Sequence, residues 1–266
     1  MATVITSTHN PRIKHVLQLS KSSSRKDENL FVIEGLREIK KASATGYHFE
    51  AVYYCPDIMN EESLAFLSQL SPQTERIEVI KHVYERMAYR NNRDGLIIEA
   101  VPKYPEPEEL KLSDNPLIFV LESVEKPGNL GAIFRTADAA DVDAVLICDS
   151  QTDIYNPNII RSSLGCLFTT PFAISTPSRI IEFLKEKGIL VISAALQTSM
   201  IYSDLDLRKP SAIVLGSEAE GLTEIWRTHS DFTVKIPMAG MADSLNVSVT
   251  AGILVFEALR QRSLRK

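Results

Sequence analysis

Residues 117–148, LIFVLESVEKPGNLGAIFRTADAADVDAVLIC, hold two apolar, strand-sized runs with a stretch of helical spacing between them. The same alternation continues along the chain. We expect strands at 117–122, 144–149, 171–174, 189–194, 211–215 and 232–236, separated by helices near 129–140, 157–165, 178–187 and 222–229. Strands that alternate with helices predict a parallel sheet covered by helices on both faces. The pattern therefore predicts an α/β domain over this part of the chain.

The last predicted helix, residues 244–262, is apolar on almost every side. Its apolar positions are Leu245, Val247, Val249, Ile253, Leu254, Val255, Phe256 and Leu259. Such a helix has to be buried on more than one face, so we expect its outer face to meet a partner subunit. Asp243 or Ser244 is the expected N-cap, which places Asn246 and Ser248 inside the helix.

The first hundred residues form a second pattern of the same class. Strands are expected at 30–33, 51–55, 77–80 and 96–101, with helices near 11–20, 36–44 and 60–70. The stretch PKYPEPEELKLSDNP that follows has four prolines and few apolar residues, so it cannot continue a helix or a central strand. We therefore predict a small α/β domain at 1–104, a linker at 105–115 and the parallel-sheet domain at 116–266.

The composition is that of a soluble globular protein, with 44% hydrophobic and 24% charged residues among 266. No apolar run approaches the 18 to 20 or so residues that cross a bilayer, and the first residues, MATVITSTHNPRIKH, lack the apolar core of a secretory signal. Three widely spaced cysteines, Cys55, Cys148 and Cys166, indicate reduced, buried thiols and not a disulfide framework. We therefore expect a cytoplasmic protein without a membrane span.

The net charge of −5 conceals a basic N-terminal part. Residues 1–41 carry eight Lys and Arg and four acidic residues, a local charge of +4, which leaves −9 for the rest. The stretch Tyr84–Arg93 interleaves three arginines with two tyrosines, a composition that suits phosphate pairing and base stacking. A solvated helix face explains that stretch equally well.

Ligands of an open parallel sheet bind at the carboxyl ends of its strands, so the loops that follow the strands are the candidate site. No G-x-G-x-x-G, no G-x-x-x-x-G-K-[ST] and no Cys/His spacing typical of a metal site occurs, which argues against a dinucleotide fold, a P-loop and a metal. In the loop at 216–222, glycines bracket Glu218 and Glu220, where carboxylates favour a cation; a solvated turn is the alternative.

Three segments, GNLGAIFRTA, VLGSEAEGL and IPMAGMADSLNVSVTAGILVFE, closely resemble, in order and spacing, the motifs of the SpoU/TrmH family of RNA ribose 2′-O-methyltransferases, of the SPOUT superfamily. ITSTHNPRIKHVLQL and LFVIEGLREIKKA resemble that family's substrate-binding domain, whose fold is like that of ribosomal protein L30e. The resemblance implies a sheet whose C-terminal segment threads a loop into a trefoil knot. It also implies bound S-adenosylmethionine and a homodimer formed through the knot.

The resemblance also implies roles for the matching residues. Arg135 is the expected catalytic residue, a clamp on phosphate or on the emerging oxyanion, since a guanidinium is a poor base; an ion pair with Asp138 is the alternative. Asn129 would precede the helix and fix the nucleotide, and Glu218 would orient Arg135 or Asn129. Ser244 and Asn246 would offer an anion the free N–H groups of a helix N-terminus.

Two further groups of residues complete the predicted site, and the resemblance implies the first of them. The expected cofactor contacts are Leu196, Gly216, Ile236, Met238 and Leu245. The expected RNA contacts are Lys14, Arg37, Arg86, Arg90 and Arg93, from the two cationic stretches, and Arg161, which resembles an arginine that the family often carries.

The function expected is methylation of a ribose 2′-hydroxyl, and the N-terminal domain favours 23S-type ribosomal RNA as the substrate. Three alternatives stay open. The protein could methylate tRNA, it could bind RNA without catalysis, or it could be a nicotinamide-dependent enzyme, which the missing glycine fingerprint disfavours.

Overall fold

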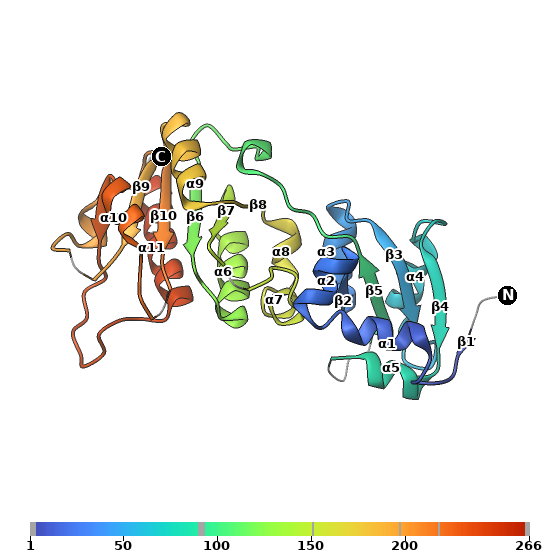
Figure 1. Ribbon diagram of the computed structural model, residues 1–266. Coiled ribbons are helices and arrows are strands. Elements are labelled where there is room, and N and C mark those ends of the chain that lie inside the picture. The colour runs from blue at the N-terminus through green and yellow to red at the C-terminus, as the bar shows by residue number, and fades with distance from the viewer. Residues whose placement is uncertain (1–3, 90–93, 151, 197, 218, 264–266) are drawn as a thin grey trace. The chain divides into compact units, whose positions relative to one another are not determined.

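A computed structural model describes residues 4–89, 94–150, 152–196, 198–217 and 219–263 (Figure 1). The chain forms two compact units. Unit 1 consists of Met1–Lys103 and Asp153–Thr169, and unit 2 of Tyr104–Thr152 and Thr170–Lys266. Residues 153–169 lie in the range that the sequence pattern assigns to the parallel-sheet domain, yet they pack in unit 1.

Unit 2 is built on a six-stranded sheet in the order β11-β9-β10-β6-β7-β8, and every pairing in it is parallel. The prediction of a parallel α/β sheet is confirmed. Its strands are β6 (Leu117–Glu122), β7 (Ala144–Cys148), β8 (Phe172–Ile174), β9 (Leu190–Ala194), β10 (Ser211–Leu215) and β11 (Phe232–Val234). Its helices are α6 (Pro127–Ala139), α9 (Pro177–Glu186), α10 (Glu224–His229), α11 (Val247–Ser263) and the short 3-10 turns η1 (Pro107–Glu109) and η2 (Tyr202–Asp204).

Helices cover both faces of this sheet, as its strands require. The central strands β6 and β10 are buried along their whole length, which accounts for their unbroken apolar sequence. On one face, Ile118, Val120 and Val214 pack in a single core with residues of α9 and with Trp226 of α10. On the other, Phe134 of α6 lies edge-on against Phe172 of β8, and α11 packs on α6 and β10.

The terminal helix α11 begins at Val247, so the predicted start at Ser244 is wrong. Asn246 lies just before the helix, and its side chain accepts hydrogen bonds from Ser248 N at 2.9 Å and Ser248 Oγ at 2.6 Å. Asn246 therefore does what an N-cap does, and neither Asp243 nor Ser244 is needed for it. Val249 and Phe256 remain 49% and 51% exposed on the described chain, so this helix keeps an uncovered apolar face.

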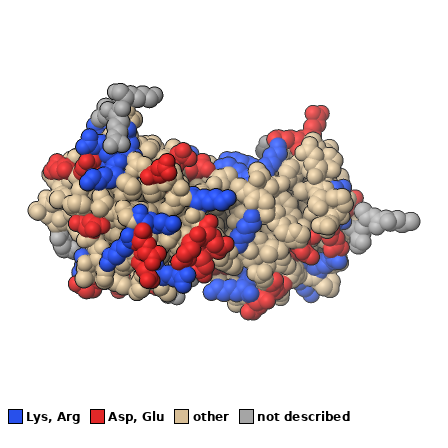
Figure 2. All heavy atoms as spheres, turned by 90° about the horizontal axis from the view of Figure 1, so that it is seen from above, with Lys and Arg blue, Asp and Glu red and all other residues tan. Residues whose placement is uncertain are grey.

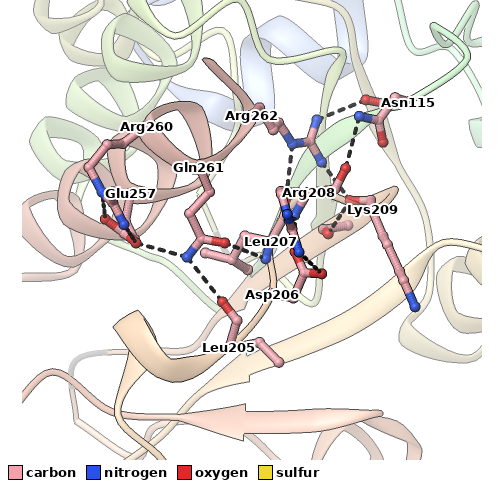
Figure 3. Close-up of polar contacts among 11 residues, drawn as sticks. Asn115, Leu205, Asp206, Leu207, Arg208, Lys209, Glu257, Arg260, Gln261 and Arg262 are labelled. Atoms are coloured by element: carbon pink, nitrogen blue, oxygen red, sulfur yellow. Dashed lines mark hydrogen bonds and ion pairs between the residues drawn. The ribbon is translucent and has the colours of Figure 1, made fainter. Parts of the chain in front are cut away.

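The other end of α11 is fixed by hydrogen bonds to two segments distant in sequence (Figure 3). The Arg262 guanidinium donates to the carbonyls of Asn115, Pro116, Leu207 and Lys209. Gln261 accepts from Leu207 N at 2.8 Å and donates to the carbonyl of Leu205 at 3.0 Å. Side-chain hydrogen bonds therefore hold both ends of the helix: Asn246 bonds to its first turn, and Gln261 and Arg262 bond its last turn to the backbone of other segments.

Unit 1 has a mixed five-stranded sheet in the order β1-β4-β3-β5-β2, with β5 antiparallel to both of its neighbours. The four predicted strands and three predicted helices are present, and β1, α2 and α5 were not predicted. The strands are β1 (Val4–Ile5), β2 (Phe31–Glu34), β3 (Phe49–Tyr54), β4 (Glu75–Val79) and β5 (Leu96–Ala100). The helices are α1 (Pro11–Gln18), α2 (Ser22–Glu28), α3 (Leu36–Ala44), α4 (Glu61–Gln69), α5 (Lys81–Met87), α7 (Pro157–Ser162) and α8 (Cys166–Thr169).

The single helix expected at 157–165 is two helices, because Leu164 and Gly165 have positive φ angles that interrupt it. The resulting segment completes the core of unit 1. Tyr155 packs against Phe31 with ring centroids 4.2 Å apart and ring planes tilted by 34°. Arg25 and Asp153, both almost fully buried, form an ion pair at 2.6 Å.

Two expectations about the class of protein can be compared with the described residues. All three cysteines are buried and outside any disulfide, as predicted. In the described part of the chain, no helix combines the length and apolar character that crossing a bilayer requires.

Candidate functional site

A pocket of about 450 Å³ lies in unit 2 at the carboxyl ends of four neighbouring strands, β6, β10, β9 and β11. The loop after each strand contributes to its wall, and the start of α11 closes it. All five residues predicted to contact the cofactor line it, together with Ser244 and Asn246. Carboxyl-end loops from adjacent parallel strands converge on one edge of a sheet, which explains why residues as far apart in sequence as Lys126 and Asn246 line the same pocket.

The loop after β10 is folded tightly against itself. A Cβ atom on Gly216 would overlap the backbone of Gly221, which itself has φ +71°. Ser217 and Gly221 also pair through a backbone bridge. Glycine at both positions is therefore a steric requirement of the loop that forms one wall of the pocket.

Glu122, at the end of β6, binds Thr223, the residue at which the loop after β10 ends. The sequence motifs did not suggest this role. Its carboxylate is fully buried and accepts hydrogen bonds from Thr223 N at 2.8 Å and Thr223 Oγ1 at 2.5 Å. Thr223 directly follows Leu222, which lines the pocket. A polar residue at the end of an otherwise apolar strand was the one available signal.

The first and third motifs meet through a hydrogen bond between two asparagines. Asn246 Nδ2 donates to Asn129 Oδ1 at 3.1 Å. Asn129 lies in the first turn of α6, so the expectation that it precedes the helix is wrong; Pro127, favoured at the first helical position, starts the helix two residues earlier. The pair joins the N-terminal ends of α6 and α11 beside the pocket.

Arg135 lies one and a half turns or so further along α6 and is exposed. It makes no hydrogen bond or ion pair with a described residue, so the alternative of an ion pair with Asp138 is not formed. It does not line the pocket. Glu218, expected to orient it, lies outside the described residues. Arg135 is thus available to a ligand that reaches it from solvent.

The charged side chains that line the pocket are mostly cationic. They are Lys126, Arg227 and Lys235. The one described carboxylate in the lining is that of Glu220. Sequence patterns did not single out these three cations, because they come from separate parts of the chain: Lys126 just before α6, Arg227 within α10 and Lys235 just after β11. Their placement favours an anionic group on the ligand or on the substrate beside it.

The predicted RNA contacts of unit 1 have different environments. Lys14 and Arg86 are exposed and make no polar contact with described residues, whereas Arg37, also exposed, pairs with Glu38 at 2.6 Å. Arg90 and Arg93 lie outside the described residues. Arg161 is half-buried and lies over the ring of Tyr89, 5.2 Å from its centroid. Tyr84 is buried, so its expected role in base stacking is wrong.

Several of the eight cations in residues 1–41 are paired with carboxylates of the protein itself. Arg12 pairs with Glu75, Arg25 with Asp153 and Lys40 with Glu62. On the face shown in Figure 2, Lys and Arg side chains are interspersed with Asp and Glu over the described residues. Binding of a polyanion there depends on particular exposed cations and not on a uniformly basic surface.

Comparison with known proteins agrees with this site. The model of the SpoU rRNA Methylase family matches residues 116–256, more than half of the chain, and that of an MRM3-like substrate binding domain matches residues 10–98. The 23S rRNA (guanosine-2′-O-)-methyltransferase RlmB of Pseudomonas aeruginosa is 38% identical over 149 residues, which are 56% of this chain. The match covers only 60% of that relative's length.

Two solved structures match over nearly the whole chain. The crystal structure of an RNA 2′-O ribose methyltransferase is 38% identical and has a TM-score of 0.84, covering 98% of this chain and 100% of that one. The AdoMet-bound rRNA methyltransferase from Sinorhizobium meliloti is 27% identical with a TM-score of 0.87, covering 97% and 98%. The motifs, the parallel sheet and these matches agree, and the chain belongs to the SpoU rRNA methylase family.

Proposed function

We propose that the protein transfers a methyl group from S-adenosylmethionine to a ribose 2′-hydroxyl of 23S-type ribosomal RNA. The observation that carries the proposal is the meeting of the motifs at one pocket. Residues of the second and third motifs line it, and Asn129 of the first is bonded to Asn246 at its rim. The Pseudomonas relative, named for 23S rRNA, and the AdoMet-bound structure support the choice of substrate and cofactor.

The pocket fits S-adenosylmethionine in size and in chemistry. Its volume of about 450 Å³ is ordinary for a ligand of this size. Apolar walls from Leu222, Ile236 and Leu254 suit the adenine ring, and the N-terminus of α11 with Lys235 suits the carboxylate. The cofactor, when bound, supplies a methyl group on a sulfonium sulfur.

The residues of this chain then have to bring the ribose to that methyl group. The Asn129–Asn246 pair holds two amide groups in a fixed orientation, suited to the sugar hydroxyls or the phosphate of the target nucleotide. Such positioning contributes roughly 7–11 kcal/mol of the barrier in the best cases. Ser244, exposed at the same rim, offers a further hydroxyl to the nucleotide.

Arg135 clamps the phosphate next to the reacting ribose or the oxyanion that forms on it. Because a guanidinium stays protonated in proteins, it is not the base. The 2′-hydroxyl proton leaves to that phosphate or to water while the positive charge of Arg135 stabilises the emerging oxyanion. The exposure of Arg135, without a described polar partner, supports this role.

The proposal includes a trefoil knot in unit 2, an L30e-like fold in unit 1, a homodimer and a cytoplasmic location. The all-parallel sheet and the likeness to solved family members support the knot. Exposed Val249 and Phe256 on α11 support the dimer. Residues 1–104 would select the RNA, together with 153–169, which pack in the same unit; 116–266 otherwise carry the transfer, with 105–115 as linker.

Mapping of 2′-O-methyl sites in total RNA from cells with and without the gene tests the proposal. We expect one methyl signal to disappear from the large ribosomal RNA and to return when the purified protein and S-adenosylmethionine are added to that RNA. Loss of a signal in tRNA instead would identify tRNA, and not ribosomal RNA, as the substrate. No loss in any RNA would refute the cellular function.

A further inference from the structure

Unit 1 contains a second pocket, of about 510 Å³, that is separate from the cofactor site. It lies between α1, β2, α5 and α7. Its apolar part is formed by Val16, Leu17, Val32, Met87 and Ile160, and its polar part by Arg86, Tyr89, Arg161 and three carboxylates. Its size is that of pockets that enclose a ligand as large as a nucleotide.

Arg161 is held at this pocket with part of its hydrogen-bonding capacity unused. Its Nη2 donates to Asn158 Oδ1 at 3.2 Å, and its guanidinium lies over the Tyr89 ring. Its Nη1 is buried and has no hydrogen-bond partner among the described residues. Leaving a buried charged donor unpaired is costly, and an acceptor on a ligand would remove that cost. The side chain is thus oriented for a partner that the described part of the protein does not supply.

Tyr89 is the aromatic residue that lines the pocket, and it is 54% exposed. Its backbone N–H donates to Glu34 Oε2 at 2.7 Å, which fixes the residue at the pocket edge. Arg161 covers one side of the ring, so an exposed side remains on which a planar base can stack. An aromatic ring beside an arginine is the usual arrangement in single-strand RNA recognition.

The carboxylates of the pocket are engaged with the protein. Asp94 accepts the N–H of Leu36 at 2.9 Å, and Glu38 accepts Arg37 at 2.6 Å. They make their side of the pocket unfavourable for phosphate. Arg86, exposed on α5 without a polar contact to described residues, makes its own side favourable. The charge distribution therefore suits one nucleotide with its base in the pocket and its phosphate at the arginines.

We propose that this pocket binds one unpaired nucleotide of the RNA substrate, with the base on Tyr89 and the phosphate at Arg161 and Arg86. The proposal rests on the proposed function, since it takes RNA as the substrate. It assigns Arg161, which lies between two strands of the methyltransferase sheet in sequence, to substrate selection in unit 1.

The test compares a fluorescent single-stranded RNA 12-mer of mixed sequence with a duplex of the same length, using the full-length protein. Tyr89→Leu should weaken binding of the single strand by at least fivefold, the lower end of what base–aromatic stacking contributes. It should leave duplex binding unchanged, because duplex bases are already stacked. Tyr89→Phe should bind the single strand as the wild type does. Arg161→Gln should weaken binding of the single strand both in the wild-type protein and in the Tyr89→Phe variant.

Matched controls are Tyr104→Leu, which removes another half-exposed tyrosine, and Arg179→Gln, which removes an exposed arginine paired with Glu108. Both should bind the single strand within twofold of the wild type. A 12-mer carrying 5-iodouridine should crosslink to Tyr89 on irradiation. Single-strand binding by Tyr89→Leu and Arg161→Gln within twofold of the wild type, or no binding of the single strand by the wild type, overturns the proposal.

Calorimetry with S-adenosylmethionine separates this proposal from the proposed function. If Tyr89→Leu loses the single strand but binds S-adenosylmethionine normally, the pocket is an RNA site even if no methylation of ribosomal RNA is found. If the wild type methylates ribosomal RNA and Tyr89→Leu does so with unchanged KM, the pocket is not part of substrate binding and the proposed function survives alone.

Discussion

Replacing Thr223 and Glu122 tests whether the loop beside the cofactor pocket is held from the end of β6. The Glu122 carboxylate is 0% exposed and accepts Thr223 N at 2.8 Å and Thr223 Oγ1 at 2.5 Å. A hydrogen bond to a charged group contributes about 1.5–3 kcal/mol. Thr223→Ala removes one of the two bonds, so the free energy of unfolding should fall by about that amount. Glu122→Gln keeps the volume but replaces one acceptor oxygen by an NH₂ donor, which costs a similar amount.

The chain offers a local probe for this measurement. Trp226 is its one tryptophan, lies three residues after Thr223 and is fully buried in α10. Urea titration followed by its fluorescence therefore reports the unfolding of unit 2. Thr228→Ala, in the same helix, is the control, because that hydroxyl is exposed and lies 3.4 Å from Glu224 Oε1. Its effect should stay within about 0.5 kcal/mol.

The double variant decides whether the two side chains act on each other. If they do, it should lose little more than the worse single variant, which gives a coupling energy of about 1.5–3 kcal/mol. Calorimetry should then show weaker S-adenosylmethionine binding in all three variants, since the loop that lines the pocket is loosened. Losses that add within about 0.5 kcal/mol would show that Glu122 does not hold Thr223.

Three other perturbations have outcomes fixed by the structure. Arg135→Lys keeps the charge but loses the planar fork, so methyl transfer in single-turnover assays should fall while S-adenosylmethionine affinity stays constant; near-normal turnover would exclude a bidentate clamp. Burial lowers the pKa of His15, but bonds and charges from Glu28 and Glu99 outweigh it and raise the pKa above 6.5. The stabilisation from His15 is therefore complete below pH 6.5 and lost as pH rises through the higher folded value, and His15→Gln should flatten urea midpoints measured from pH 6 to 9. Phe256→Glu, at a position 51% exposed on α11, should turn a dimer into a monomer in light scattering, and an unchanged mass would remove that face from the interface.

The sheet of unit 2 could be predicted because its strands are buried on both faces. Strands such as β6 and β10 are read as continuous apolar runs, and only a parallel sheet with helices on both sides accommodates several of them. The convergence of the strand-end loops then follows from parallel order alone. What the pattern could not give was the cap of α11, since Asp243, Ser244 and Asn246 are all good N-caps and the choice depends on the bond from Asn246 to Asn129.

The organisation of unit 1 shows a different limit. Helix α2, SSSRKDE, has no apolar face, and no periodicity predicts it. Its Arg25 is 3% exposed, because it donates to the carbonyls of Leu19 and Ser20 and pairs with Asp153. The partner of Arg25 lies 128 residues away in sequence, beyond the reach of any local pattern.

The same ion pair changes how the charge of the N-terminal part bears on RNA binding. A count of eight cations in residues 1–41 treats each as available to phosphate. Arg25 is buried, and Arg37 is paired with Glu38, so neither offers an unopposed charge to a ligand. Displacing such a partner costs part of what a new phosphate contact contributes, whereas an exposed cation without a polar contact, such as Lys14 or Arg86, gives up only water. The affinity for RNA should therefore depend on the few exposed cations that have no polar contact with described residues. It should not depend on the total number of Lys and Arg residues in the segment.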